Sequence, residues 1–157
     1  MQRAYNASHE YCLHAASLMM VKEKYLVIQT AFIGDVVLAT GIAEKIHQYY
    51  PDAQIDFLVR KGNEGLLSNH PFIRTIVWDK KESKYANLLA LHRMNRKQQY
   101  KKVINLQRFG STGFLTAFSK AGETVGFTKN PFHIFFSRKV KHVFSTGKEQ
   151  VIHEIER

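Results

Sequence analysis

The chain has 157 residues, 45% hydrophobic and 12% aromatic, which suits one folded domain with a core and excludes a disordered chain. Lys and Arg number 23 against 13 Asp and Glu, so a negatively charged partner is expected: nucleic acid, a membrane surface, or a phosphorylated or carboxylated small molecule. Cys12 is the only cysteine, which excludes an intrachain disulfide and favours a reducing, cytoplasmic setting. No apolar stretch approaches the roughly 20 residues that cross a bilayer.

Residues 1–22 have no clear period and are expected to form an N-terminal extension. From residue 23 onward, β-rich runs alternate with helical patterns, which is typical of a βαβ protein with a parallel sheet. The expected strands are residues 25–29, 54–59, 75–78, 102–106, 124–127 and 140–144. The pattern therefore predicts an α/β fold.

Two helices are expected between these strands. The first spans residues 35–50, and its sheet-facing residues are expected to be Leu38, Ile42, Ile46 and Tyr49. The second spans residues 85–96, with a rougher apolar pattern through Tyr85, Leu88, Leu89 and Met94. The basic run "RMNRKQQYKK" that follows is expected to lie at a solvated helix end, where cations suit the helix dipole.

The turn between the first strand and the first helix, residues 30–35, lies where open parallel sheets usually bind ligands. The first helical N–H groups favour an anion or a polar oxygen, and Gly34 lets a ligand approach the backbone beside Asp35. A second interpretation is purely structural: Asp35 caps the helix and Gly34 serves a tight turn. One glycine is too few for a dinucleotide fingerprint, and the Gly-Lys-Ser/Thr of a P-loop is missing, so sites of those two kinds are not expected.

Further polar residues follow the second and fourth strands on the same predicted edge. Arg60 and Lys61 end the second strand and would bind an anion or lie solvated. After the fourth strand come Arg108, as a third cation, and three polar residues, Gln107, Ser111 and Thr112. Ser111 or Thr112 would alternatively cap the next helix. The histidines show no metal-ligand spacing, and Trp78 and residues 132–136 are expected in core or interdomain packing.

The passage "YLVIQTAFIGDVVLATGIAEKIHQYYPDAQIDFLVRKGNEGLL" resembles the opening of the bacterial family 9 glycosyltransferases, which include the ADP-heptose:lipopolysaccharide heptosyltransferases. Further along, "NHPFIRTIVWDK", "YKKVINLQRF", "VGF" and "HEIER" occur in the order and spacing of that family. The resemblance covers residues 24–157. It departs from the family pattern at Gly41, where proline is usual, and this leaves the geometry of the first helix in question.

The resemblance implies a GT-B architecture, in which a Rossmann-like N-terminal half, with helices on both faces of its sheet, binds the acceptor. Residues 23–147 would form this acceptor-binding domain, and residues 148–157 would begin an interdomain helix. The donor-binding half would be absent, so the chain alone is expected to be inactive in transfer.

The resemblance also implies roles for residues. Asp35 would be the general base of an inverting reaction, and the substrate-binding residues would be Thr30, Gly34, Arg60, Lys61 and Arg108. The candidate sugar contacts would be Gln107, Ser111 and Thr112. The resemblance implies a reaction that needs no metal. It would need no cofactor either, because the donor, a nucleotide-sugar such as ADP-heptose, is a substrate. The acceptor would be an anionic saccharide or the lipopolysaccharide core.

The remaining basic residues have two interpretations. They are expected to form a merely solvated face or to dock anionic lipopolysaccharide precursors at the inner leaflet, with peripheral contact to the inner membrane; the set is Arg93, Arg96, Lys101, Lys139 and Lys141. A competing hypothesis is a basic Rossmann-like module that binds nucleic acid or another anionic ligand. Because the basic residues are scattered and match no nucleic-acid motif, nucleic acid is not the expected partner.

Overall fold

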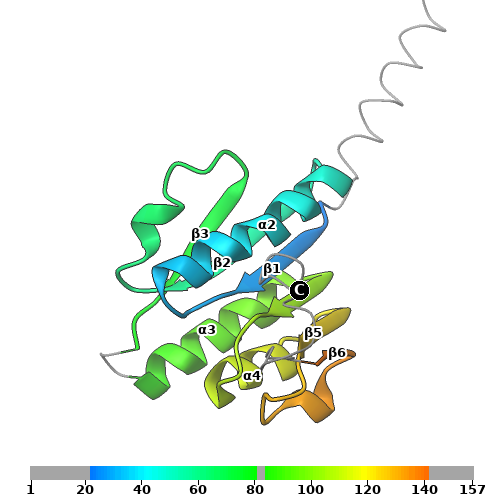
Figure 1. Ribbon diagram of the computed structural model, residues 1–157. Helices are drawn as coiled ribbons and strands as arrows, with labels where there is room; N and C mark the ends of the chain where they lie inside the picture. The colour runs from blue at the N-terminus through cyan, green and yellow to red at the C-terminus, as the bar shows by residue number, and fades with distance from the viewer. Residues whose placement is uncertain (1–21, 81–83, 142–157) are drawn as a thin grey trace, which may run out of the picture.

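The computed structural model describes residues 22–80 and 84–141 of the chain (Figure 1). In chain order its elements, with η for short 3-10 helices, are β1 (Lys24–Ile28), α2 (Ile33–Tyr49), β2 (Gln54–Arg60), η1 (Glu64–Leu66), β3 (Ile73–Trp78), α3 (Lys84–Gln98), β4 (Lys102–Asn105), α4 (Gly110–Ala117), β5 (Glu123–Phe127), η2 (His133–Phe135) and β6 (Arg138–Val140). Strands and helices thus alternate as the sequence predicts.

The strands of the described residues form a six-stranded sheet in the order β3-β2-β1-β4-β5-β6. Every neighbouring pair is parallel. On the two sides of β1, for example, Leu26 lies opposite Asp56 of β2 and Val103 of β4. Because strands are added on one side of β1 and then on the other, the chain reverses direction across the sheet between β1 and β4. The α/β class with a parallel sheet is confirmed.

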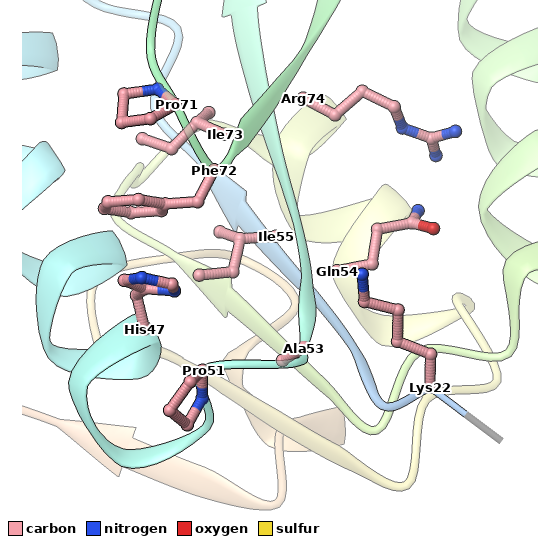
Figure 2. Close-up of a pocket in the computed structure, with 10 residues that line it drawn as sticks. All are labelled: Lys22, His47, Pro51, Ala53, Gln54, Ile55, Pro71, Phe72, Ile73 and Arg74. Atoms are coloured by element: carbon pink, nitrogen blue, oxygen red, sulfur yellow. The ribbon is translucent and has the colours of Figure 1, made fainter. Parts of the chain in front are cut away.

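A pocket of about 460 Å³ lies at the amino ends of β2 and β3 (Figure 2). Phe72 and Ile55 supply apolar walls, and His47 faces them from the end of α2. The His47 ring is stacked on Phe72 with 3.9 Å between the ring centroids, so it packs as part of the wall. The residues that the sequence predicts for the site all follow carboxyl ends of strands, at the opposite end of the sheet.

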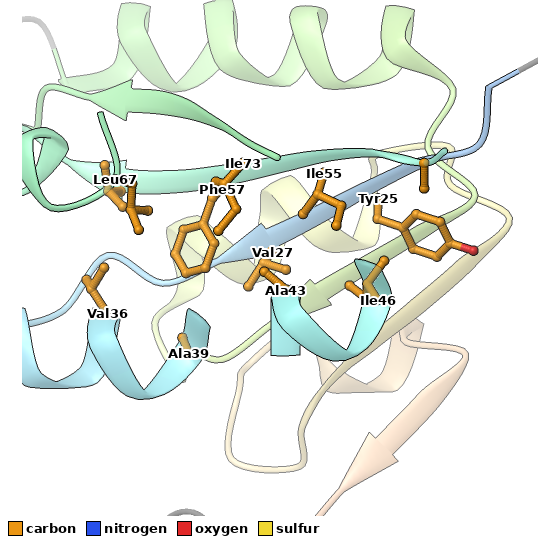
Figure 3. Close-up of a cluster of buried hydrophobic side chains, with 12 residues drawn as sticks. Tyr25, Val27, Val36, Ala39, Ala43, Ile46, Ile55, Phe57, Leu67 and Ile73 are labelled. Atoms are coloured by element: carbon orange, nitrogen blue, oxygen red, sulfur yellow. The ribbon is translucent and has the colours of Figure 1, made fainter. Parts of the chain in front are cut away.

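Two clusters of buried side chains cover the two faces of the sheet. Tyr25 and Val27 of β1 belong to the first cluster, which α2 covers (Figure 3). Leu26 and Ile28 alternate with them and belong to the second cluster, together with Leu91 of α3 and Leu115 of α4. A strand buried on both faces is the expected pattern for the centre of a parallel sheet. Helices therefore cover both faces, as predicted.

Helix α2 buries a different face from the one predicted. Its buried residues are Val36, Ala39, Ala43 and Ile46. Leu38 and Tyr49 are exposed, so the prediction for these two was wrong. Small alanine side chains allow the helix to lie close to the sheet, whereas a hydrophobic pattern gives most weight to bulky residues.

The predicted face of α3 was also partly wrong. Tyr85 and Leu89 are exposed, whereas Leu91, which was not in the predicted pattern, is buried. Leu88 and Met94 pack against the second cluster as expected. The basic end of α3 is solvated as predicted, since Arg96 and Lys97 of its last turn are both exposed.

The other predictions of strands and segments had mixed outcomes. Strand β6 ends at Val140, where the predicted strand was to begin, and residues 142–144 lie outside the described residues. Residues 1–21 and 148–157 are also outside them, so the predicted extension and interdomain helix stay predictions. Trp78 is buried as predicted, and within residues 132–136 Phe136 is buried while Ile134 and Phe135 are exposed.

Replacing Gly41 by Ala is expected to raise the free energy of unfolding by about 0.5–1 kcal/mol, because alanine has the higher helix propensity. Gly41 lies inside the continuous helix α2, and no atom would lie within 4 Å of an added Cβ. Urea unfolding of the chain measures the change. Gly113→Ala is the control, because the added Cβ would clash with the Asn130 side chain, so this substitution should destabilise the fold. A gain at both positions would contradict the explanation.

Candidate active site

The candidate site lies at the carboxyl edge of the sheet, around the point where the strand order reverses. The loops after β1 and β4 begin there side by side, since Leu106 N donates to Ile28 O at 3.0 Å. The first loop leads to α2 on one face of the sheet, and the second leads to α4 on the other. In open α/β sheets this divergence creates the usual ligand-binding position.

The helix after β1 begins earlier than the sequence suggests. Phe32 is the N-cap, with extended backbone angles and no capping side chain, and Val36 N donates to Phe32 O at 3.2 Å. Asp35 is therefore the third residue of α2 and not its cap, so that structural interpretation was wrong. Gly34 lies inside the helix without a positive φ, so it does not serve a tight turn either.

The Asp35 carboxylate has no role in holding the described fold. Asp35 is exposed, and no hydrogen bond or ion pair joins its side chain to another described residue. The neighbouring Gly34 leaves open space, because a Cβ there would meet no atom within 4 Å. Helix α2 thus presents a carboxylate and free N–H groups of its first turn to the same region. Such a group can accept a proton or bind a polar ligand.

The two basic residues at the end of β2 differ in their surroundings. Arg60 is the last residue of β2, and its guanidinium carbon lies 5.1 Å from the centroid of the Phe32 ring. Lys61 Nζ lies 2.6 Å from Asp79 Oδ2, so much of its charge is neutralised within the protein. The contact with Phe32 holds Arg60 next to the first turn of α2. Arg60 is consequently the better placed of the two to bind an anion.

Thr30 is linked to a cation that the sequence analysis missed. Lys80, just after β3, donates from Nζ to Thr30 Oγ1 at 2.9 Å, and the same Nζ lies 4.6 Å from the centroid of the Trp78 ring. Thr30 is buried, so its hydroxyl reaches a ligand only beside Lys80. The sequence did contain a signal for Lys80. Lys80 comes just after the end of a strand of the same parallel sheet, as Lys61 does.

In the loop after β4, one of the predicted residues faces solvent and one is buried. Arg108 is exposed, as a candidate for ligand binding must be. Gln107 is buried. Its side-chain Nε2 donates to Oε1 of Gln29, which follows β1, and its backbone carbonyl accepts a bond of 3.0 Å from Asn130 Nδ2. The Gln107 side chain therefore links the two loops and is not placed to contact a sugar.

Neither Ser111 nor Thr112 caps α4. The N-cap is Phe109, without a capping side chain, and the helix begins at Gly110. Thr112 is buried, and its hydroxyl donates to Phe109 O at 2.9 Å, so it is not placed to contact a sugar. Both strand-to-helix turns of the site thus use a phenylalanine as N-cap, against the usual preference for Ser, Thr, Asp or Asn.

Among residues 22–80 and 84–141, no three His, Cys, Asp or Glu side chains are grouped so that they could hold a metal ion. None of the described helices has the length and apolar composition needed to cross a membrane.

No family model matches the chain. Among curated proteins, it is 28% identical over 123 residues to the lipopolysaccharide core heptosyltransferase OpsX of Haemophilus influenzae, covering 76% of this chain and 35% of that protein. Its fold resembles a family 9 glycosyltransferase from Veillonella parvula, with a TM-score of 0.65 and 23% identity over 78% of this chain and 37% of the other. Heptosyltransferase WaaC of E. coli, solved with ADP-2-deoxy-2-fluoro heptose, gives a TM-score of 0.63 and 18% identity, covering 78% of this chain and 44% of WaaC.

The similarity is confined to part of each relative. The chain spans about a third of the length of OpsX and less than half of each solved relative. Within that part the similarity extends over most of the described residues, and the solved structures share the fold of the parallel sheet. In sequence the chain is similar to a lipopolysaccharide core heptosyltransferase, and in fold it is similar to a family 9 glycosyltransferase.

Proposed function

We propose that this chain is the acceptor-binding half of a heptosyltransferase-type glycosyltransferase. The enzyme would transfer heptose from ADP-heptose to a lipopolysaccharide core or related acceptor, in the bacterial cytoplasm at the inner membrane. One observation carries the proposal: the Asp35 carboxylate, which no described residue engages, stands on the first turn of α2 at the carboxyl edge of the sheet. The names of the relatives support the choice of sugar and acceptor.

In the proposed reaction, Asp35 takes the proton from the acceptor hydroxyl. The hydroxyl oxygen forms a bond to the anomeric carbon of the donor as the bond from that carbon to the diphosphate breaks, and ADP leaves with the bonding electrons. The attack comes from the face opposite to ADP, so the anomeric configuration inverts, and the sugar passes through an oxocarbenium-like state. A carboxylate at a helix N-terminus is a weak base, which suffices if the proton moves late, when the attacking oxygen has become acidic.

Recognition of the acceptor would use the cations around Asp35. Arg60, held against Phe32, is suited to bind a carboxylate or phosphate through two donors. Lys80 beside Thr30 and the exposed Arg108 would bind further anionic groups of the same acceptor. Gly34 leaves room for the acceptor at the helix backbone. Lys61, paired with Asp79, would contribute less.

Binding of the acceptor by the chain tests the proposal. Titration calorimetry with a deacylated, anionic lipopolysaccharide-core saccharide should give a measurable Kd, and Arg60→Gln should weaken binding about 10- to 100-fold, because a charge-assisted bond is lost. Lys45→Gln is the control, since this exposed cation lies on α2 away from the carboxyl edge and bonds only to Gln48 among the described residues. Equal affinities for the two variants would overturn the proposed role of Arg60.

Transfer should require a donor-binding half in addition to these 157 residues. With ADP-heptose and the core saccharide, the 157 residues alone are expected to yield no product, because the proposed acceptor-binding half would not hold the departing diphosphate. A fusion of the chain to the donor-binding half of a family 9 relative should yield product without added metal. Chromatography of the saccharide detects the transfer, and robust turnover by the chain alone would contradict the division of roles.

A further inference from the structure

The excess of positive over negative charge in the described fold lies in one half of it. Residues 22–80, which form β1 to β3 and α2, carry seven Lys and Arg and seven Asp and Glu. Residues 84–141, which form α3, α4 and β4 to β6, carry twelve Lys and Arg against Glu123 as the one acid. The excess charge is therefore a property of one side of the molecule and not of its whole surface.

Helix α3 combines these cations with exposed apolar side chains. Its sequence contains no acidic residue, and Arg93, Arg96 and Lys97 are all exposed. Tyr85 is 75% exposed and Leu89 is 48% exposed. Residues 85, 89, 93 and 96 follow each other at helical spacings of four and three, so they lie along one outer strip of the helix. This strip is apolar at its start and cationic at its end.

The neighbouring elements continue the same combination. Helix α3 contacts α4, and α4 contacts η2, so the three lie side by side (Figure 1). Ile134 is 64% exposed and Phe135 is 55% exposed on η2, and the Phe135 ring centroid lies 5.7 Å from that of Phe118 at the end of α4. Lys120 lies two residues after Phe118 and is exposed. Exposed apolar side chains thus lie among cations across the whole layer.

We propose that this layer, the outer side of α3, α4 and η2, docks on an anionic lipid bilayer. Cations are attracted to anionic headgroups, and each Lys or Arg near such a surface strengthens binding about fivefold. Apolar side chains such as Leu89 and Ile134 gain by entering the boundary between headgroups and acyl chains. A nucleic acid would attract the same cations, but its phosphate backbone offers nothing to an exposed aliphatic side chain. The combination therefore favours the bilayer.

This inference rests on the proposed placement of the enzyme at the inner membrane and names the surface that docks there, but it is tested without any sugar, so its failure is distinguishable from a failure of acceptor binding. Co-sedimentation with vesicles of phosphatidylglycerol and phosphatidylcholine should detect binding that falls with salt, and vesicles of phosphatidylcholine alone should bind far less. Arg93→Gln with Arg96→Gln should weaken binding about 25-fold, from two charges at fivefold each. Lys22→Gln with Lys45→Gln removes two charges from the neutral half and should change binding little.

The apolar contribution is tested separately. Leu89→Ser with Ile134→Ser should weaken vesicle binding about tenfold, whereas Tyr49→Ser, which alters an exposed side chain of α2, should leave it unchanged. Losses confined to the α3 and η2 variants would support the docking surface. Equal losses in the controls, or no loss from the apolar pair, would overturn it. Tighter binding to duplex DNA than to anionic vesicles would overturn it as well.

Discussion

Asp35→Asn should lower kcat by about a hundredfold to ten-thousandfold in a fusion of this chain to the donor-binding half of a family 9 relative, because an amide cannot accept the proton of the acceptor hydroxyl. The fold should survive, since Asp35 is exposed and no described residue bonds to its side chain. The free energy of unfolding is expected to change by less than about 0.5 kcal/mol. Steady-state transfer from ADP-heptose and urea unfolding measure the two effects.

A second acidic residue provides the control for this substitution. Asp52 is exposed in the turn between α2 and β2, at the opposite end of the helix from Asp35. Asp52→Asn removes the same charge and should leave kcat unchanged. A near-normal kcat for Asp35→Asn would mean that this carboxylate is not the base, and equal losses in both variants would assign the effect to net charge.

Asp56→Ala should lower the free energy of unfolding by about 3 kcal/mol and Tm by roughly 6–12 °C. Asp56 has no exposed surface, and it accepts bonds from Arg74 Nε at 2.8 Å, Arg74 Nη2 at 2.6 Å and the Tyr100 hydroxyl. Burial raises the pKa of Tyr100, and the bond to Asp56 raises it further, so this hydroxyl stays a donor. In the Asp56→Ala variant the Tyr100 hydroxyl remains buried without its acceptor. Arg74 is half exposed and can turn to water, which limits the loss.

An ion pair near the surface is the matched control for Asp56. Glu23 pairs with Lys101 and also accepts a bond of 2.8 Å from the Tyr25 hydroxyl, but both charged side chains are well exposed to solvent. Glu23→Gln should therefore cost less than about 1 kcal/mol. Urea unfolding of the two variants in the same buffer compares them directly. If Asp56→Ala cost no more than Glu23→Gln, the buried network would not be a main source of stability.

The sequence was sufficient to predict the parallel sheet, because its central strands are nearly continuous apolar runs bounded by turns. Residues 25–28 show this best, with every side chain buried. The sequence pattern did not reveal which faces of α2 and α3 are buried. Ala39 and Ala43 pack on the sheet while the bulkier Leu38 stays exposed, and this depends on how closely the helix approaches the sheet. A helical period locates a face only within a residue or two.

For the candidate site, the sequence placed the residues on the correct edge but not their contacts. Asp35, Arg60 and Arg108 follow strand ends in the same parallel sheet, so topology alone brings them to one edge. The pairing of Lys61 with Asp79 depends on two neighbouring strands ending together, which no local pattern records. Propensity also failed at the helix start: Asp is a favoured cap, yet the backbone enters α2 two residues before Asp35.

The hydrogen bond between the side chains of Gln29 and Gln107 links the loop after β1 to the loop after β4. Gln29 Oε1 accepts both from Gln107 and, at 3.3 Å, from the N–H of Ala31, one residue before the Phe32 cap of α2. A substitution in either loop is consequently felt in the other, so the effects of paired changes across β1 and β4 should not add. In the proposed transferase, the effect of a change in one loop on acceptor specificity should therefore depend on the residues present in the other loop.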